Sequence, residues 1–73
     1  MNGMVTKELI SYIGEDGVFD SSRYLSDHIM SDQLIRDLNR LESLGYLTLD
    51  HGDDRIVEIG ITDKLIALSR AGQ

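Results

Sequence analysis

The stretch Ser31–Leu47, SDQLIRDLNRLESLGYL, decides how the rest of the chain is interpreted. Its apolar residues recur three and four positions apart, which places them on one face of an α-helix. This stripe consists of Leu34, Ile35, Leu38, Leu41 and Leu44. Ser31 stands where an N-cap is expected, and Asp32 complements the positive end of the helix. Gly45 stands where a left-handed residue ends a helix. The stretch therefore predicts one amphipathic helix, Ser31–Leu44.

The spacing of the apolar residues changes from 3.6 to 2 after this helix. Leu47 and Leu49 lie on one side of an extended segment, and the turn-forming run Asp50–Asp54 follows them. A second alternating segment then sets Val57, Ile59 and Ile61 on one face and Ile56, Glu58 and Gly60 on the other. The pattern predicts a β-hairpin.

The segment before Ser31 predicts two more helices. The first is Met4–Ile13, with an apolar stripe at helical spacing and a glycine-rich turn after it. Asp20 and its neighbouring serines offer an N-cap for a short helix ending near Ile29. The buried contacts expected for this helix are Leu25 and Ile29, with Tyr24 or His28 at its margin. Between the helices, Val18 and Phe19 are expected to form a short strand or to cover the core from a loop.

Composition limits the class of protein. The chain has 73 residues, seven basic and thirteen acidic, with a formal net charge of -6. This length predicts one domain, residues 1–73, with a small core. Cysteine is absent, so disulfides and thiolate metal sites are excluded. No apolar run approaches the roughly 20 residues of a membrane helix, and no signal-peptide core is visible. These features predict a cytoplasmic protein with no membrane partner.

The order of helices followed by a hairpin resembles a winged helix-turn-helix domain over roughly residues 18–68. The run Arg40–Leu47, RLESLGYL, is similar to the end of the recognition helix in many bacterial winged-helix regulators. Ile61–Lys64, ITDK, resembles the step with which such domains leave the wing. The resemblance implies an α+β fold with three helices, a C-terminal wing of two or three β-strands, and a short final helix that Thr62 or Asp63 caps and that runs to about Leu68.

The resemblance also implies a function, which is DNA binding in transcriptional regulation. The recognition helix, about 31–44, would enter the major groove, and the wing, about 47–59, would flank it. The DNA-binding residues it implies are Arg23, Ser31, Gln33, Arg36, Arg40 and Arg55. Such a protein needs no cofactor. A two-fold homodimer would double the phosphate contacts of a monomer that binds weakly alone.

Acidic residues support an alternative of a different class. Asp37 follows Arg36 in the sequence, and the predicted wing carries four carboxylates against Arg55. Carboxylates near phosphates oppose the counterion release that supplies most nonspecific affinity for DNA. The alternative is an acidic winged-helix module that binds a protein and not DNA. Ile35 and Ile56 would then be exposed apolar anchors, so their exposure discriminates between the two functions.

No catalytic or metal-binding constellation is recognised. His28 and His51 are the only histidines and lack the paired spacing of zinc ligands. Aligned from Asp50, a calcium-loop pattern fails, because Arg55 occupies its glycine position and Ile61 its glutamate position. No glycine-flanked nucleophile or phosphate-binding glycine loop is present. The sequence therefore predicts a binding protein and not an enzyme.

Overall fold

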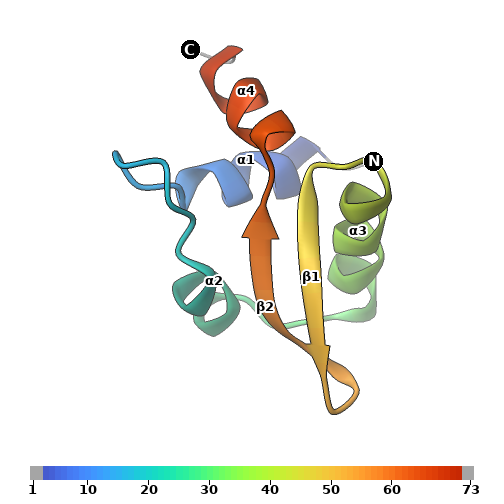
Figure 1. The fold of residues 1–73 in the computed structure, drawn as a ribbon. Coiled ribbons are helices and arrows are strands. Elements are labelled where there is room, and N and C mark those ends of the chain that lie inside the picture. Colours follow the sequence, from blue (N-terminus) through green and yellow to red (C-terminus); the bar gives the residue numbers. More distant parts are fainter. Residues whose placement is uncertain (1–2, 72–73) are drawn as a thin grey trace.

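A computed structural model describes residues 3–71 of the chain, with side chains from Val5 onward. Within these residues the elements follow the predicted order (Figure 1): α1 (Gly3–Ser11), α2 (Ser21–Asp27), α3 (Asp32–Ser43), β1 (Leu47–Gly52), β2 (Arg55–Ile61) and α4 (Asp63–Ala71). The expected α+β class is confirmed. None of the helices in residues 3–71 has the length and hydrophobicity needed to cross a membrane.

The hairpin β1–β2 organises the helices around it. α3 packs on β1, α2 packs on β2, and α1 and α4 contact each other. Figure 1 shows α1 and α4 at the end where β2 finishes, and the hairpin turn at the opposite end. The sheet of the described residues has these two antiparallel strands. The third strand that the resemblance allowed is reduced to an isolated bridge between Ile13 and Phe19.

The predicted ends of α3 are confirmed by its hydrogen bonds. At the N-terminus, the Ser31 hydroxyl accepts a hydrogen bond from the Leu34 N–H at 3.2 Å. At the C-terminus, Gly45 has a φ of 86°, in the left-handed region that glycine occupies without strain. Its N–H donates to the Glu42 carbonyl at 3.0 Å, and the Tyr46 N–H donates to the Leu41 carbonyl at 3.0 Å. This pair of bonds is a Schellman motif, which satisfies the last carbonyls of the helix.

The start of α4 holds the C-terminal end of α3. The Thr62 hydroxyl donates to the Gly45 carbonyl at 2.6 Å. The Lys64 ammonium donates to the Leu44 carbonyl at 2.7 Å and lies 4.6 Å from the centroid of the Tyr46 ring. A cation at a helix C-terminus and over an aromatic face is favourable in both positions. The end of α3 is therefore tied to the α1–α4 end of the molecule.

A β-bulge overturns the predicted faces of β2. Asp50 pairs with Glu58, but His51 pairs with Ile56, so Val57 has no opposite residue in β1. An extra residue in one strand reverses the alternation beyond it. Ile56 is 7% exposed and shares the core with Ile59, whereas Val57 is 47% exposed. The prediction that Val57 shares a face with Ile59 was wrong because strict alternation assumes a strand without a bulge.

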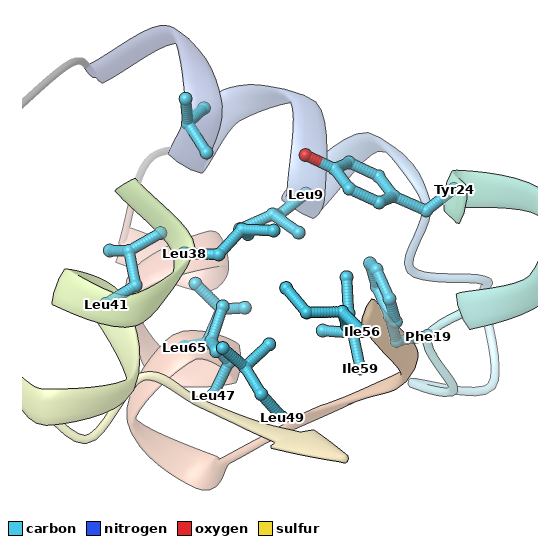
Figure 2. Close-up of a cluster of buried hydrophobic side chains, with 11 residues drawn as sticks. Leu9, Phe19, Tyr24, Leu38, Leu41, Leu47, Leu49, Ile56, Ile59 and Leu65 are labelled. Carbon is cyan, nitrogen blue, oxygen red and sulfur yellow. The ribbon is translucent and has the colours of Figure 1, made fainter. Parts of the chain in front are cut away.

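The buried core joins residues from every element (Figure 2). Its members are Val5, Leu9, Phe19, Tyr24, Leu38, Leu41, Leu47, Leu49, Ile56, Ile59 and Leu65. One expectation for the second helix was wrong, because Ile29 is 89% exposed instead of buried. Of the two residues considered for its margin, His28 is half-buried and Tyr24 is fully buried. α2 ends at Asp27 and His28 is extended, so Ile29 is not one helical turn beyond Leu25. Phe19 covers the core as expected, whereas Val18 is exposed.

Candidate nucleic-acid interface

The outward face of α3 carries three of the six predicted site residues. Gln33, Arg36 and Arg40 are exposed, and Asn39 and Ser43 extend the same polar surface. Arg36 and Arg40 are one turn apart, so both guanidinium groups project from one side of the helix. Within the described residues, no carboxylate forms an ion pair with either arginine. Both charges are therefore available to a partner.

The acidic residues of α3 mostly turn away from this face. Asp37 is 9% exposed and accepts a hydrogen bond from the Gln33 side-chain amide at 3.2 Å. Glu42 is half-buried and accepts a hydrogen bond from the Leu49 N–H at 2.9 Å. Asp32, in the first turn, is the exposed carboxylate of the helix. Asp37 follows Arg36 in the sequence, but helical rotation of about 100° per residue points the two side chains in different directions.

The remaining predicted site residues come from other elements or have structural roles. The Ser31 hydroxyl is the N-cap acceptor of α3. Arg23 lies on α2, with its Nε 4.0 Å from the Asp27 carboxylate, and both side chains are largely exposed. An exposed pair of this kind contributes little to stability. Arg55 is exposed at the start of β2. The structure thus brings Gln33, Arg36 and Arg40 together on α3, while Arg23 and Arg55 belong to other surfaces.

The hairpin keeps its acidic character. Asp50, Asp53, Asp54 and Glu58 are all exposed, against the single cation of Arg55. Asp54 has a φ of 61°, a conformation that aspartate adopts in turns more readily than most residues. The hairpin turn therefore presents carboxylates to solvent at the end of the molecule opposite α1 and α4.

A cluster of titratable residues between α1 and α2 was not predicted. His28 Nε2 lies 2.6 Å from the Glu8 carboxylate, and His28 Nδ1 lies 2.9 Å from the Tyr24 carbonyl. The Tyr12 hydroxyl donates to the Asp27 carboxylate at 2.7 Å. The His28 ring also stacks on Tyr24, with centroids 4.1 Å apart. Glu8 and His28 are twenty residues apart in the chain, so no local spacing in the sequence indicates this cluster.

The surroundings of His28 favour its charged form. Burial lowers its pKa, but the hydrogen bonds to the Tyr24 carbonyl and the Glu8 carboxylate outweigh burial, and Asp27 adds to them. The pKa of His28 is therefore raised. An imidazolium donates from both ring nitrogens, so it satisfies both acceptors at once. This arrangement holds α1 to α2 and leaves no ring nitrogen free for a metal. Residues 5–71 contain no group of three or more side chains placed to hold a metal ion.

The raised pKa of His28 predicts a pH-dependent stability. A group whose pKa is higher in the folded than in the unfolded state stabilises the fold below the unfolded pKa, about 6.5 for histidine. That contribution is lost as the pH rises through the folded pKa. We expect the free energy of unfolding, measured by urea denaturation, to fall as the pH rises above about 6.5, and His28→Gln to remove this fall. His51→Gln, at an exposed position in β1, is the control. An unchanged pH profile in His28→Gln would contradict the assignment.

Comparison of the chain with family models, curated proteins and solved structures finds no match. The described residues define the class of protein as a small α+β domain with four helices and a two-stranded antiparallel hairpin.

Proposed function

We propose that this protein is a winged-helix DNA-binding protein, a transcriptional regulator whose α3 enters the major groove of double-stranded DNA. The observation that carries the proposal is the division of charge on α3. Arg36 and Arg40 are exposed and free of ion pairs within the described residues, whereas Asp37 and Glu42 are turned toward the protein and hydrogen-bonded. α3 carries three carboxylates against two guanidinium groups, but Asp32 in the first turn is its exposed carboxylate, so the outer face beyond that turn is basic and polar.

The placement of α3 in the fold supports this role. Its C-terminal end is fixed through Leu44 and Gly45, near α4. Its twelve residues extend about 18 Å from there. Figure 1 shows its N-terminal end directed toward the same end of the molecule as the hairpin turn. A helix of this length fits the major groove, and the hairpin beside it would flank the groove as a wing.

The exposure of two isoleucines weighs against the alternative of a protein-interaction module. That alternative needs Ile35 and Ile56 as apolar anchors at a contact surface. Ile56 is 7% exposed and belongs to the core. Ile35 is partly buried and packs against the core cluster. Neither side chain presents the exposed apolar surface that a hot spot requires.

The acidic hairpin sets the expected strength of binding. With three or four phosphate contacts, the logarithm of the affinity should fall with the logarithm of the salt concentration with a slope of about −3. Such a monomer binds tightly only at low salt, and a dimer that contacts two half-sites would bind more tightly. Asp53 and Asp54 at the hairpin turn would lie away from the phosphates or weaken the complex.

The double substitution Arg36→Ala/Arg40→Ala tests the proposal. We expect it to weaken the complex with a mixed-sequence duplex about tenfold or more at low salt and to reduce the salt slope by about two. Binding is measured by amide NMR titration of labelled protein, which also checks that the fold is intact. Shifts in the parent should concentrate on α3 and the hairpin and should fade at physiological salt.

The control removes the same charge elsewhere. Lys7 on α1 and Arg70 on α4 are both exposed, so Lys7→Ala/Arg70→Ala has the same net charge as the α3 double variant. It should bind nearly as the parent does. Equal losses in the two variants would show that net charge alone governs binding, and full binding by the α3 variant would place the DNA on another surface.

A further inference from the structure

The outer edge of β2 carries backbone groups that β1 does not use. The Ile59 N–H donates to the Ser21 hydroxyl at 2.8 Å, so it points away from β1. The Thr62 N–H donates to the Tyr46 carbonyl at 3.2 Å, on the side of β1. Along an antiparallel strand, successive residues direct both their N–H and C=O groups alternately toward the partner strand and away from it. Ile59 and Ile61 therefore both direct their N–H and C=O groups away from the hairpin.

Among residues 3–71, most of these edge groups have no partner. Ser21 takes the Ile59 N–H, and its helix α2 covers part of the strand. Within the described residues, no other backbone segment bonds to the Ile59 carbonyl or to the Ile61 N–H. Bare strand edges pair readily with another extended chain. Figure 1 shows this edge of β2 facing α2 and the α1–α2 loop, with no strand beside it.

An open groove runs along this edge. It has a volume of about 1100 Å³ and lies between Glu58–Ile61 of β2 and the segment Ser11–Arg23. Apolar side chains from both sides line it, among them Ile13, Phe19 and Ile66. Val18, which is 63% exposed, also lines the groove, so an apolar side chain is available to a bound chain.

The groove is negatively charged. Four carboxylates line it, those of Asp16, Asp20, Asp27 and Glu58, against the single guanidinium of Arg23. Asp20 caps α2, and Asp27 accepts the Tyr12 hydroxyl. Glu58 is exposed and makes no ion pair within the described residues. Cationic side chains on a bound strand would complement this charge.

We propose that this groove binds an extended basic segment of a partner protein, which adds a strand to the outer edge of β2. Main-chain hydrogen bonds to the Ile59 carbonyl and to the backbone groups of Ile61 supply affinity, and alternate side chains meet the apolar lining and the carboxylates. A second copy of this chain fits less well, because pairing two β2 edges would bring the same carboxylates together. No residue of α3 lines the groove, so this inference is independent of DNA binding.

The test uses a synthetic capped peptide of alternating lysine and valine, titrated into labelled protein at low salt. We expect amide shifts at Val18, Phe19 and Ile59–Ile61, and slower hydrogen exchange of the Ile61 amide in the complex. A lysine–proline peptide whose lysine main-chain nitrogens are also methylated has the same charge but no backbone N–H to donate, and should bind about tenfold more weakly. A peptide of alternating glutamate and valine should not bind.

Two matched variants test the role of charge. Asp16→Asn/Glu58→Gln removes two groove charges and keeps the acceptor oxygen that receives the Val18 N–H at 3.1 Å. This variant should bind the lysine–valine peptide about fivefold more weakly than the parent. Asp53→Asn/Asp54→Asn at the hairpin turn removes the same charge outside the groove and should weaken binding about twofold or less.

Three results would overturn the proposal. One is a flat titration with the lysine–valine peptide. Another is equal binding by the lysine–proline peptide, which would reduce the interaction to charge. The third is protection of the Ile61 amide that grows with protein concentration in the absence of peptide, which would assign the edge to a second copy.

Discussion

Replacing Leu38 by alanine is expected to remove a large share of the stability of this domain. Leu38 is fully buried at the centre of the core, where Figure 2 shows it between Leu9 and Leu41. Loss of a buried leucine side chain costs about 3 kcal/mol, from the lost transfer free energy and the cavity left behind. A 73-residue domain has about 4–11 kcal/mol in total. The melting temperature should fall by more than about 12 °C.

Urea denaturation followed by circular dichroism measures this effect, and Leu68→Ala is its control. Leu68 lies on α4 and is 39% exposed, so the same truncation leaves no enclosed cavity. The Leu38 variant should show a lower midpoint with an unchanged slope, as expected for a change in stability alone. Equal midpoints for the two variants would mean that Leu38 is not at the centre of the core.

Replacing Tyr24 by phenylalanine is expected to stabilise the protein. Tyr24 is fully buried, and its hydroxyl has no hydrogen-bond partner among the residues that the structure describes. A buried polar group without a partner costs about 1–3 kcal/mol, so removing it should raise the free energy of unfolding by about 1 kcal/mol or more. Phenylalanine keeps the ring contacts with Tyr12, Phe19 and His28, whose centroids lie 5.2, 5.8 and 4.1 Å away. Thermal and urea unfolding of parent and variant measure the difference.

Tyr12→Phe is the matched control for this substitution. The Tyr12 hydroxyl donates to the Asp27 carboxylate, so its removal should lower stability. Opposite signs for the same chemical change at neighbouring tyrosines would show that the hydroxyl environment decides the outcome. A loss of stability in Tyr24→Phe would contradict the assignment, because it would mean that the Tyr24 hydroxyl is satisfied in solution.

Alkaline pH gives a second readout of the Tyr24 environment. Burial raises the pKa of Tyr24 to about 12 from about 10, with the Glu8 and Tyr12 charges adding to the effect. The folded state therefore keeps the Tyr24 proton at pH values where the unfolded state loses it. Ionisation of Tyr24 therefore leaves the free energy of unfolding unchanged below pH 10 and lowers it from pH 10 to pH 12. Tyr24→Phe should remove that part of the decline.

The helix at the centre of the candidate interface was predictable because its signals are local. Ser31, Gly45 and the leucines between them determine the N-cap, the C-cap and the buried face through contacts within a few residues. The same holds for the Asp20 N-cap, whose carboxylate accepts the Arg23 N–H at 3.2 Å. Gln33, Arg36 and Arg40, which the resemblance implied as DNA-binding residues, lie outside the apolar stripe of this helix and are exposed.

The faces of β2 were not predictable, because a bulge is decided by the partner strand. Ile56, Val57 and Ile59 have similar hydrophobicity, so the sequence gives no preference for which two enter the core. The register shift between Asp50 and His51 determines which residues of β2 face the core, and it buries Ile56. The exposure test for a protein-interaction module could therefore be applied only to the folded chain.

The sequence by itself determined the order of the elements, the ends of α3 and the α+β class, since these depend on capping and periodicity within short segments. The tertiary structure alone decided which charges are free. It buried Asp37, attached Glu42 to Leu49 and paired His28 with Glu8. It also left the outer edge of β2 open along an acidic groove. These features depend on contacts between residues far apart in the chain, and local spacing carries no information about them.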